Sequence, residues 1–145
     1  MTDEFKIITM DNDLKLQDIM AVRMTRPDQY ITIMCPYKMR HIVKELIVGA
    51  ELRSRDIPQI GGMTANELVE RGANINFTYK VDNKTGIGLE NGTVVSMCFD
   101  PNNLRGRNIN LLVNYKISAK MTDEVIRNYL PIIAASKKSR IINFP

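Results

Sequence analysis

The stretch TVVSMCFDPNNLRGRNINLLVNYKI, residues 93–117, decides how we interpret the fold, because two apolar segments flank a Pro-Asn-Asn turn. Apolar and polar residues alternate in both segments, which is typical of half-buried strands. Two similar segments precede it, NINFTYKV at 74–81 and GIGL at 86–89. Asn91-Gly92 is the strongest hairpin signal, because both central residues of such a turn must tolerate a positive φ. We therefore predict an antiparallel β-meander of about four strands over residues 74–117.

Helical periodicity flanks the predicted meander. Apolar residues recur at helical spacing over 37–53, and Thr122 can cap a second helix over 122–135, which Pro131 should end or kink. The N-terminal part predicts a strand at 5–10, a helix at 14–24, a strand at 29–35 and a short helix at 64–72. The expected fold class is α+β: a meander packed against two main helices, with an N-terminal strand-helix-strand extension, in one domain spanning residues 1–145.

The last residues, 137–145, are interpreted as a C-terminal arm. Lys137, Lys138 and Arg140 form a basic group, and Ile141, Ile142 and Phe144 follow it. An apolar terminus must pack against something, so this segment either adds a strand to its own sheet or adds one to a neighbouring subunit. The second alternative would make the arm a route to oligomers.

The turn FDPNNLRGRNIN, residues 99–110, places Arg105 and Arg107 on either side of a glycine. It resembles the acyl-CoA loop of the GNAT acetyltransferases, which has an Arg/Gln-x-x-Gly-x-Gly/Ala pattern between a strand and a helix. The resemblance implies backbone amides that hold a pyrophosphate. However, Asn108 and Asn110 stand where the family has small residues, and a strand-like segment follows. A connection between two strands, with exposed arginines, explains the stretch better.

Charge suggests a second kind of partner. The formal net charge is +4, and the pI is near 9.1. Arg105 and Arg107 could straddle a phosphate, with Lys137, Lys138 and Arg140 as further contacts if folding brings them together. However, acidic residues lie among the basic ones along the whole chain. The balance therefore permits a nucleic-acid partner without requiring one.

The sequence contains no recognisable catalytic motif. His41 is the single histidine, and Cys35 and Cys98 lie apart on apolar segments, which favours two buried thiols over a disulfide or a zinc site. Asp11 and Asp13 form a D-x-D, but they are explained by helix capping more simply than by a metal. We expect no catalytic residue, no cofactor and no metal ion.

We therefore expect a non-enzymatic protein that associates with itself or with a protein partner through the C-terminal arm. The alternatives are a nucleic-acid-binding regulator and, less favoured, a degenerate acetyltransferase. The richness in isoleucine, asparagine and methionine suggests a phage structural or assembly component. The acidic start MTDEFKIITMDND is unlike a signal peptide, and no apolar run is long enough for a membrane span, so we expect a cytoplasmic location, or the virion if a phage encodes the chain.

Overall fold

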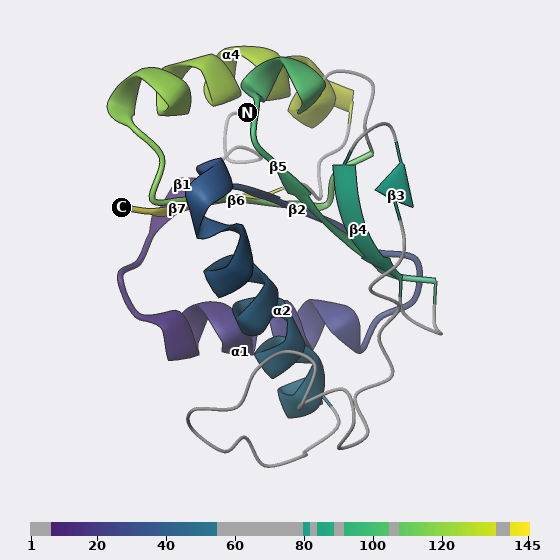
Figure 1. Ribbon diagram of the computed structural model, residues 1–145. Helices are drawn as coiled ribbons and strands as arrows, with labels where there is room; N and C mark the ends of the chain where they lie inside the picture. Colours follow the sequence, from purple (N-terminus) through teal and green to yellow (C-terminus); the bar gives the residue numbers. More distant parts are fainter. Residues whose placement is uncertain (1–6, 55–79, 82–83, 89–91, 105–107, 136–139) are drawn as a thin grey trace.

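The computed structural model describes residues 7–54, 80–81, 84–88, 92–104, 108–135 and 140–145 (Figure 1). Their strands form one sheet in the order β1-β7-β6-β2-β5-β4-β3. The bounds of the strands are β1 Ile7–Thr9, β2 Tyr30–Met34, β3 Lys80–Val81, β4 Lys84–Gly88, β5 Val94–Cys98, β6 Leu111–Tyr115 and β7 Arg140–Phe144. Five of them, β1, β7, β6, β2 and β5, run parallel, and β4 and β3 continue the sheet antiparallel beyond β5.

The predicted antiparallel meander is wrong, because β5 and β6 do not pair with each other. β2 lies between them and is parallel to both: Thr32 is the register partner of Ser96 on β5 and of Leu112 on β6. The chain is therefore an α/β protein and not an α+β protein. The hairpin predicted at Asn91-Gly92 is confirmed, since β4 and β5 pair antiparallel on either side of it and Gly92 has a φ of +88°.

Helices cover both faces of the sheet (Figure 1). α1 (Asp13–Met24) and α2 (Arg40–Ser54), the latter preceded by the 3-10 turn η1 (Tyr37–Met39), pack on one face, here called the α1/α2 face. α4 (Ala119–Ala135) and the 3-10 turn η2 (Pro101–Leu104) pack on the other, here called the α4 face. The predicted helices at 14–24, 37–53 and 122–135 are confirmed, although α4 begins earlier and continues past Pro131.

The helices on both faces of the sheet explain why the sequence pattern wrongly predicted antiparallel strands. All five residues of β6 are buried, and so are four of the five in β2. A parallel strand between two helical layers buries both rows of its side chains, whereas an antiparallel meander normally leaves one row in water. In β6, Leu111, Val113 and Tyr115 enter the core under α1 and α2, while Leu112 enters the smaller core under α4.

The stretch 99–110 is a crossover and not a tight turn. Because β5 and β6 are parallel, the chain must return from the carboxyl end of β5 to the amino end of β6. Leu104 and Ile109 from this connection are buried in the core of the α4 face. The predicted connection between two strands is thus confirmed, but the strands it joins lie on either side of β2. The predicted helix at 64–72 and most of the strand at 74–81 lie outside the described residues.

Candidate binding surface at the carboxyl edge of the sheet

The topology marks one place where a ligand is expected. In open α/β sheets, ligands bind outside the carboxyl ends of the strands, where two adjacent strands send their connections to opposite faces. β2 and β6 are such a pair: α2 follows β2 on one face, and α4 follows β6 on the other (Figure 1). The segments that leave these strands, 35–37 and 116–118, therefore border the expected site.

An aromatic pair stands at this edge, just beyond β2 and β5. Tyr37 is 61% exposed, and its ring meets the ring of Phe99 edge to face, with centroids 5.1 Å apart and an interplanar angle of 79°. The Arg40 guanidinium carbon lies 4.0 Å from the centroid of the Tyr37 ring, and Arg40 Nη1 donates to the Tyr37 carbonyl oxygen at 3.0 Å. A large exposed ring is thus held in place by two neighbours.

Further basic residues lie close to Tyr37 in the sequence. Lys38 and His41 are exposed and flank Arg40 in the sequence, and neither η1 nor the first turn of α2 contains an acidic residue. We call Tyr37, Lys38, Arg40, His41 and Phe99 the aromatic–basic surface.

The start of α1 lies at the same edge of the sheet but is acidic, unlike the aromatic–basic surface. Asn12 Oδ1 accepts the amide hydrogens of Leu14 and Lys15, at 2.9 and 3.2 Å, and Asp13 lies in the first turn. The predicted cap is present at this segment, but Asn12 is the N-cap residue and not Asp11 or Asp13. The negative charges of Asp13 and of the exposed Asp11 make the start of α1 unsuited to an anion.

An unpaired polar side chain lies beneath the same edge. Asn114, near the carboxyl end of β6, is 0% exposed, and neither its Oδ1 nor its Nδ2 has a hydrogen-bond partner among the described residues. Its register partners are Met34 on β2 and Asn143 on β7. Buried amides are nearly always hydrogen-bonded, so an apolar residue here would suit the core better. Such exceptions occur most often at functional sites.

The backbone immediately after β6 is strained. Lys116 has a φ of +55°, which is unusual for a residue with a side chain and is found most often in turns and at functional sites. Its Nζ lies 5.7 Å from the centroid of the Tyr115 ring and 5.4 Å from that of Phe144. Tyr115 donates its hydroxyl hydrogen to Asp13 Oδ1 at 3.3 Å. Burial, and then the charge of Asp13, raises the pKa of Tyr115 to about 12.

Both cysteines are free and buried, as predicted. Cys35 packs in the core of the α1/α2 face and Cys98 in that of the α4 face, although the Cys35 amide donates to the Cys98 carbonyl oxygen at 3.1 Å. Burial, followed by the neighbouring Cys98, raises the pKa of the Cys35 thiol to about 12. A thiol with such a pKa is protonated at neutral pH and is a poor nucleophile.

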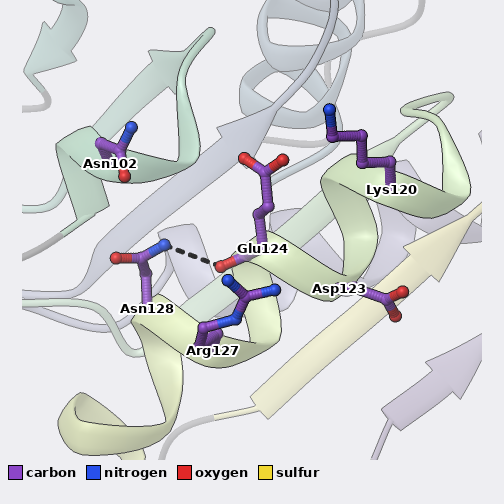
Figure 2. Close-up of a pocket in the computed structure, with 6 residues that line it drawn as sticks. All are labelled: Asn102, Lys120, Asp123, Glu124, Arg127 and Asn128. Carbon is purple, nitrogen blue, oxygen red and sulfur yellow. Dashed lines mark hydrogen bonds between the residues drawn. The ribbon is translucent and has the colours of Figure 1, made fainter.

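A pocket of about 300 Å³ lies between η2 and the first half of α4 (Figure 2). All the residues that line it are polar or charged, and the charges are of both signs: Asn102, Lys120, Asp123, Glu124, Arg127 and Asn128. Figure 2 shows Asn102 on η2 facing Glu124 and Asn128 on α4, where Asn128 Nδ2 donates to the Glu124 carbonyl oxygen at 2.8 Å. Ligand pockets are usually lined mostly by apolar groups, so this one has the character of a solvated helix face.

The structure describes four of the eight predicted site residues. Arg105, Arg107, Lys137 and Lys138 lie outside the described residues. Arg140 is described and exposed, at the start of β7 and hence at the amino edge of the sheet, far along the strands from the aromatic–basic surface.

Arg140 has basic neighbours of its own at that edge. Burial, followed by the charges of Arg26 and Arg140, lowers the pKa of Arg23, which donates to Gln29 Oε1 at 3.4 Å.

The three apolar residues of the predicted arm belong to the chain's own sheet. Ile141, Ile142 and Phe144 are buried in β7, which pairs with β6 on one side and β1 on the other. This is the first of the two alternatives that the sequence left open. A partner cannot contact these side chains unless β7 leaves the sheet.

Sequence reasoning missed Tyr37, Arg40, Phe99 and Asn114. Two signals were present in the sequence. The Cys-Pro-Tyr and Cys-Phe-Asp segments both follow apolar strands, and Asn114 interrupts an otherwise apolar run. They could be interpreted only after the strands were known to be parallel, because only parallel neighbours bring such segments to one edge.

Three further findings bear on the class of protein. No group of three or more His, Cys, Asp or Glu side chains within the described ranges is placed to hold a metal ion. Among the helices of the described part, none combines the length and the apolar character needed to cross a membrane. Comparison of the sequence with known protein families and with characterised proteins gave no match.

Proposed function

We propose that this chain is a non-enzymatic binding protein whose partner docks at the carboxyl edge of the sheet. The observation that carries the proposal is the geometry of Tyr37, which is 61% exposed although Arg40 and Phe99 both contact its ring. Fixing a side chain in one position costs conformational entropy. A fixed, exposed aromatic flanked by arginine has the character of a binding hot spot, in which tyrosine and arginine are enriched.

The chemistry of nearby groups supports binding over catalysis. Cys35 is buried with a pKa of about 12, so its thiolate is scarce at neutral pH. The Tyr115 hydroxyl has a pKa of about 12 and is already donating to Asp13. The resemblance of residues 99–110 to the acetyltransferase loop gains no support from the fold, since β6 follows where that family has a helix.

Self-association, which the sequence suggested, would need a surface other than the C-terminal arm. Self-association through residues 137–145 would require Ile141, Ile142 and Phe144 to leave the core. Self-association through the carboxyl edge requires no such change. A phage structural or assembly role stays a prediction from composition.

Size-exclusion chromatography with light scattering tests the proposal. The wild-type chain and the control Tyr30→Ala, which removes an exposed aromatic at the amino edge, should show a mass above the 16.5 kDa of one chain, from self-association or a bound partner. The double variant Tyr37→Ala, Arg40→Ala should elute at 16.5 kDa. A wild-type chain that is a monomer and binds no partner, or a double variant that keeps the wild-type assembly or partner, would refute the proposal.

A further inference from the structure

We propose that the aromatic–basic surface binds a single-stranded nucleic acid, with one base stacked on Tyr37 and the backbone phosphates on Lys38 and Arg40. This inference rests on the proposed function and names the partner. Proteins that bind single strands combine exposed aromatic rings, on which bases stack, with cations that follow the backbone. Both kinds of group occur together here within residues 37–41 and at Phe99.

The ring of Tyr37 is positioned for stacking before any ligand arrives. The Arg40 guanidinium lies over one face of the Tyr37 ring, 4.0 Å from its centroid, and the Phe99 ring meets Tyr37 edge to face, so both restrict the ring and a base would stack on the face that Arg40 does not cover. The Arg40 bond to the Tyr37 carbonyl oxygen restricts Arg40 in turn. A base that stacks on a ring already in place costs little ordering entropy. Every base has a π face, so this contact tolerates any sequence.

The charge around the ring is suited to phosphate. Lys38, Arg40 and His41 lie within residues 37–41, and neither η1 nor the first turn of α2 contains an acidic residue. The acidic residue beside Phe99 is Asp100, whose Oδ1 accepts the Asn102 amide hydrogen at 3.0 Å in the η2 turn. Cations that contact phosphates release counterions from the nucleic acid, which supplies much of the affinity.

The ring favours an unpaired strand over other anionic partners. In a duplex the bases are stacked on one another and are not free to stack on a protein ring, whereas unpaired bases do so readily. An acidic peptide could pair with Lys38 and Arg40 but offers no flat group to Tyr37.

The amino edge is the competing basic surface. There Arg140 and Tyr30 are exposed, the latter by 38%, but Arg23 is only 8% exposed and its guanidinium is bonded to Gln29. No ring contact or cation–π pair is found for Tyr30 among the described residues. Tyr30 and Arg140 therefore serve as matched aromatic and cationic controls.

The test is a fluorescence anisotropy titration of a labelled oligothymidylate of about 20 nucleotides, longer than the sites of about 4–16 nucleotides that single-strand-binding folds occupy. Tyr37→Ala should raise Kd about five- to 150-fold, the range expected from losing one stacked base. Tyr37→Phe should stay within about twofold of wild type, because the stacking face remains. Tyr30→Ala and Arg140→Ala should bind as wild type.

Salt dependence gives an independent measurement. Each phosphate contact contributes about 0.7 to the slope of log Kd against log salt for a single strand, so Lys38→Ala should lower the slope by about that amount. The Tyr37→Ala variant should keep the wild-type slope, since it removes stacking and no charge. Circular dichroism of each variant verifies that the fold is retained.

Several outcomes would overturn the inference. One is the absence of binding at protein concentrations up to about 100 µM, the weak limit for non-specific binding. Another is a loss of affinity in Arg140→Ala or Tyr30→Ala that equals the loss in Tyr37→Ala, which would assign binding to the amino edge. A labelled polyglutamate peptide that binds as tightly as the oligonucleotide, and is unaffected by Tyr37→Ala, would indicate an acidic protein partner. That last result would leave a partner at the carboxyl edge only if Arg40→Ala abolishes the peptide binding; peptide binding that also survives Arg40→Ala would contradict the proposed function as well, as would a monomer that binds no partner.

Discussion

Removing β7 should unfold the protein and not merely change its oligomeric state. A chain truncated after residue 139 loses Ile141, Ile142 and Phe144, which are all buried, and it leaves β1 with no paired strand among those described. Burying each such side chain contributes about 1.5–3 kcal/mol. Three of them together approach the whole stability of a typical domain, about 5–15 kcal/mol.

A point variant measures the same contribution in a chain that still folds. Ile142 is 1% exposed in the core of the α1/α2 face, so Ile142→Ala should lower the free energy of unfolding by about 2–5 kcal/mol. With a urea m value of about 2 kcal/mol/M, a loss of 3 kcal/mol lowers the midpoint by about 1.5 M. The exposed neighbour Arg140 is the control, since Arg140→Ala should change stability by less than about 0.5 kcal/mol.

The assay is urea unfolding followed by circular dichroism, with light scattering on the same samples. We expect the truncated chain to show no cooperative transition and Ile142→Ala to show a lower midpoint. A truncated chain that unfolds cooperatively and differs from wild type only in its oligomeric mass would refute the reasoning. It would mean that residues 140–144 serve as an arm exchanged between subunits.

Three further changes test other features. Asn114→Leu should stabilise the fold by about 1–3 kcal/mol by removing unpaired buried amide atoms, and a melting temperature below that of wild type would contradict this. Gly92→Ala should destabilise by about 1–3 kcal/mol in urea unfolding, because φ is +88° and the added Cβ would overlap the Asp28 carboxylate; Asp28→Ala in the same chain should recover only part of the loss. The raised pKa of Cys35 means that the folded chain favours the neutral thiol. Its contribution to the free energy of unfolding is therefore complete below the unfolded pKa near 9 and declines as the pH rises towards 12. Over that pH range, the urea midpoint should fall less steeply in Cys35→Ala than in wild type.

The helices could be predicted from the sequence because their signals are local. The apolar spacing over 37–53 and the polar residues before Leu14 depend only on neighbours within a turn or two, and α2 and α1 form there. The Asn91-Gly92 hairpin is equally local and was also predicted. Pro131 was expected to end or kink its helix, but the helical backbone continues to Ala135.

The strand order could not be predicted because it depends on distant pairings. β6 contains Leu111, Leu112, Val113 and Tyr115, and only Asn114 gave the segment its alternating appearance. In this segment, the sequence pattern of a fully buried parallel strand differs from that of a half-exposed antiparallel strand only by that one polar residue. The carboxyl-edge surface was missed for the same reason, since Tyr37 and Phe99 are 62 positions apart and meet only because β2 and β5 are parallel.

The position of β7 has a consequence for synthesis of the chain. β1 precedes the other strands in the chain, yet the register partner of Ile7 is Ile141, which is translated 134 residues later. Until then, β6 is an open sheet edge with apolar side chains on both faces, and such edges recruit other chains. Contacts of this sequence separation also slow folding. We therefore expect the nascent protein to aggregate readily in the interval before β7 leaves the ribosome, and to depend on chaperones when it is made in quantity.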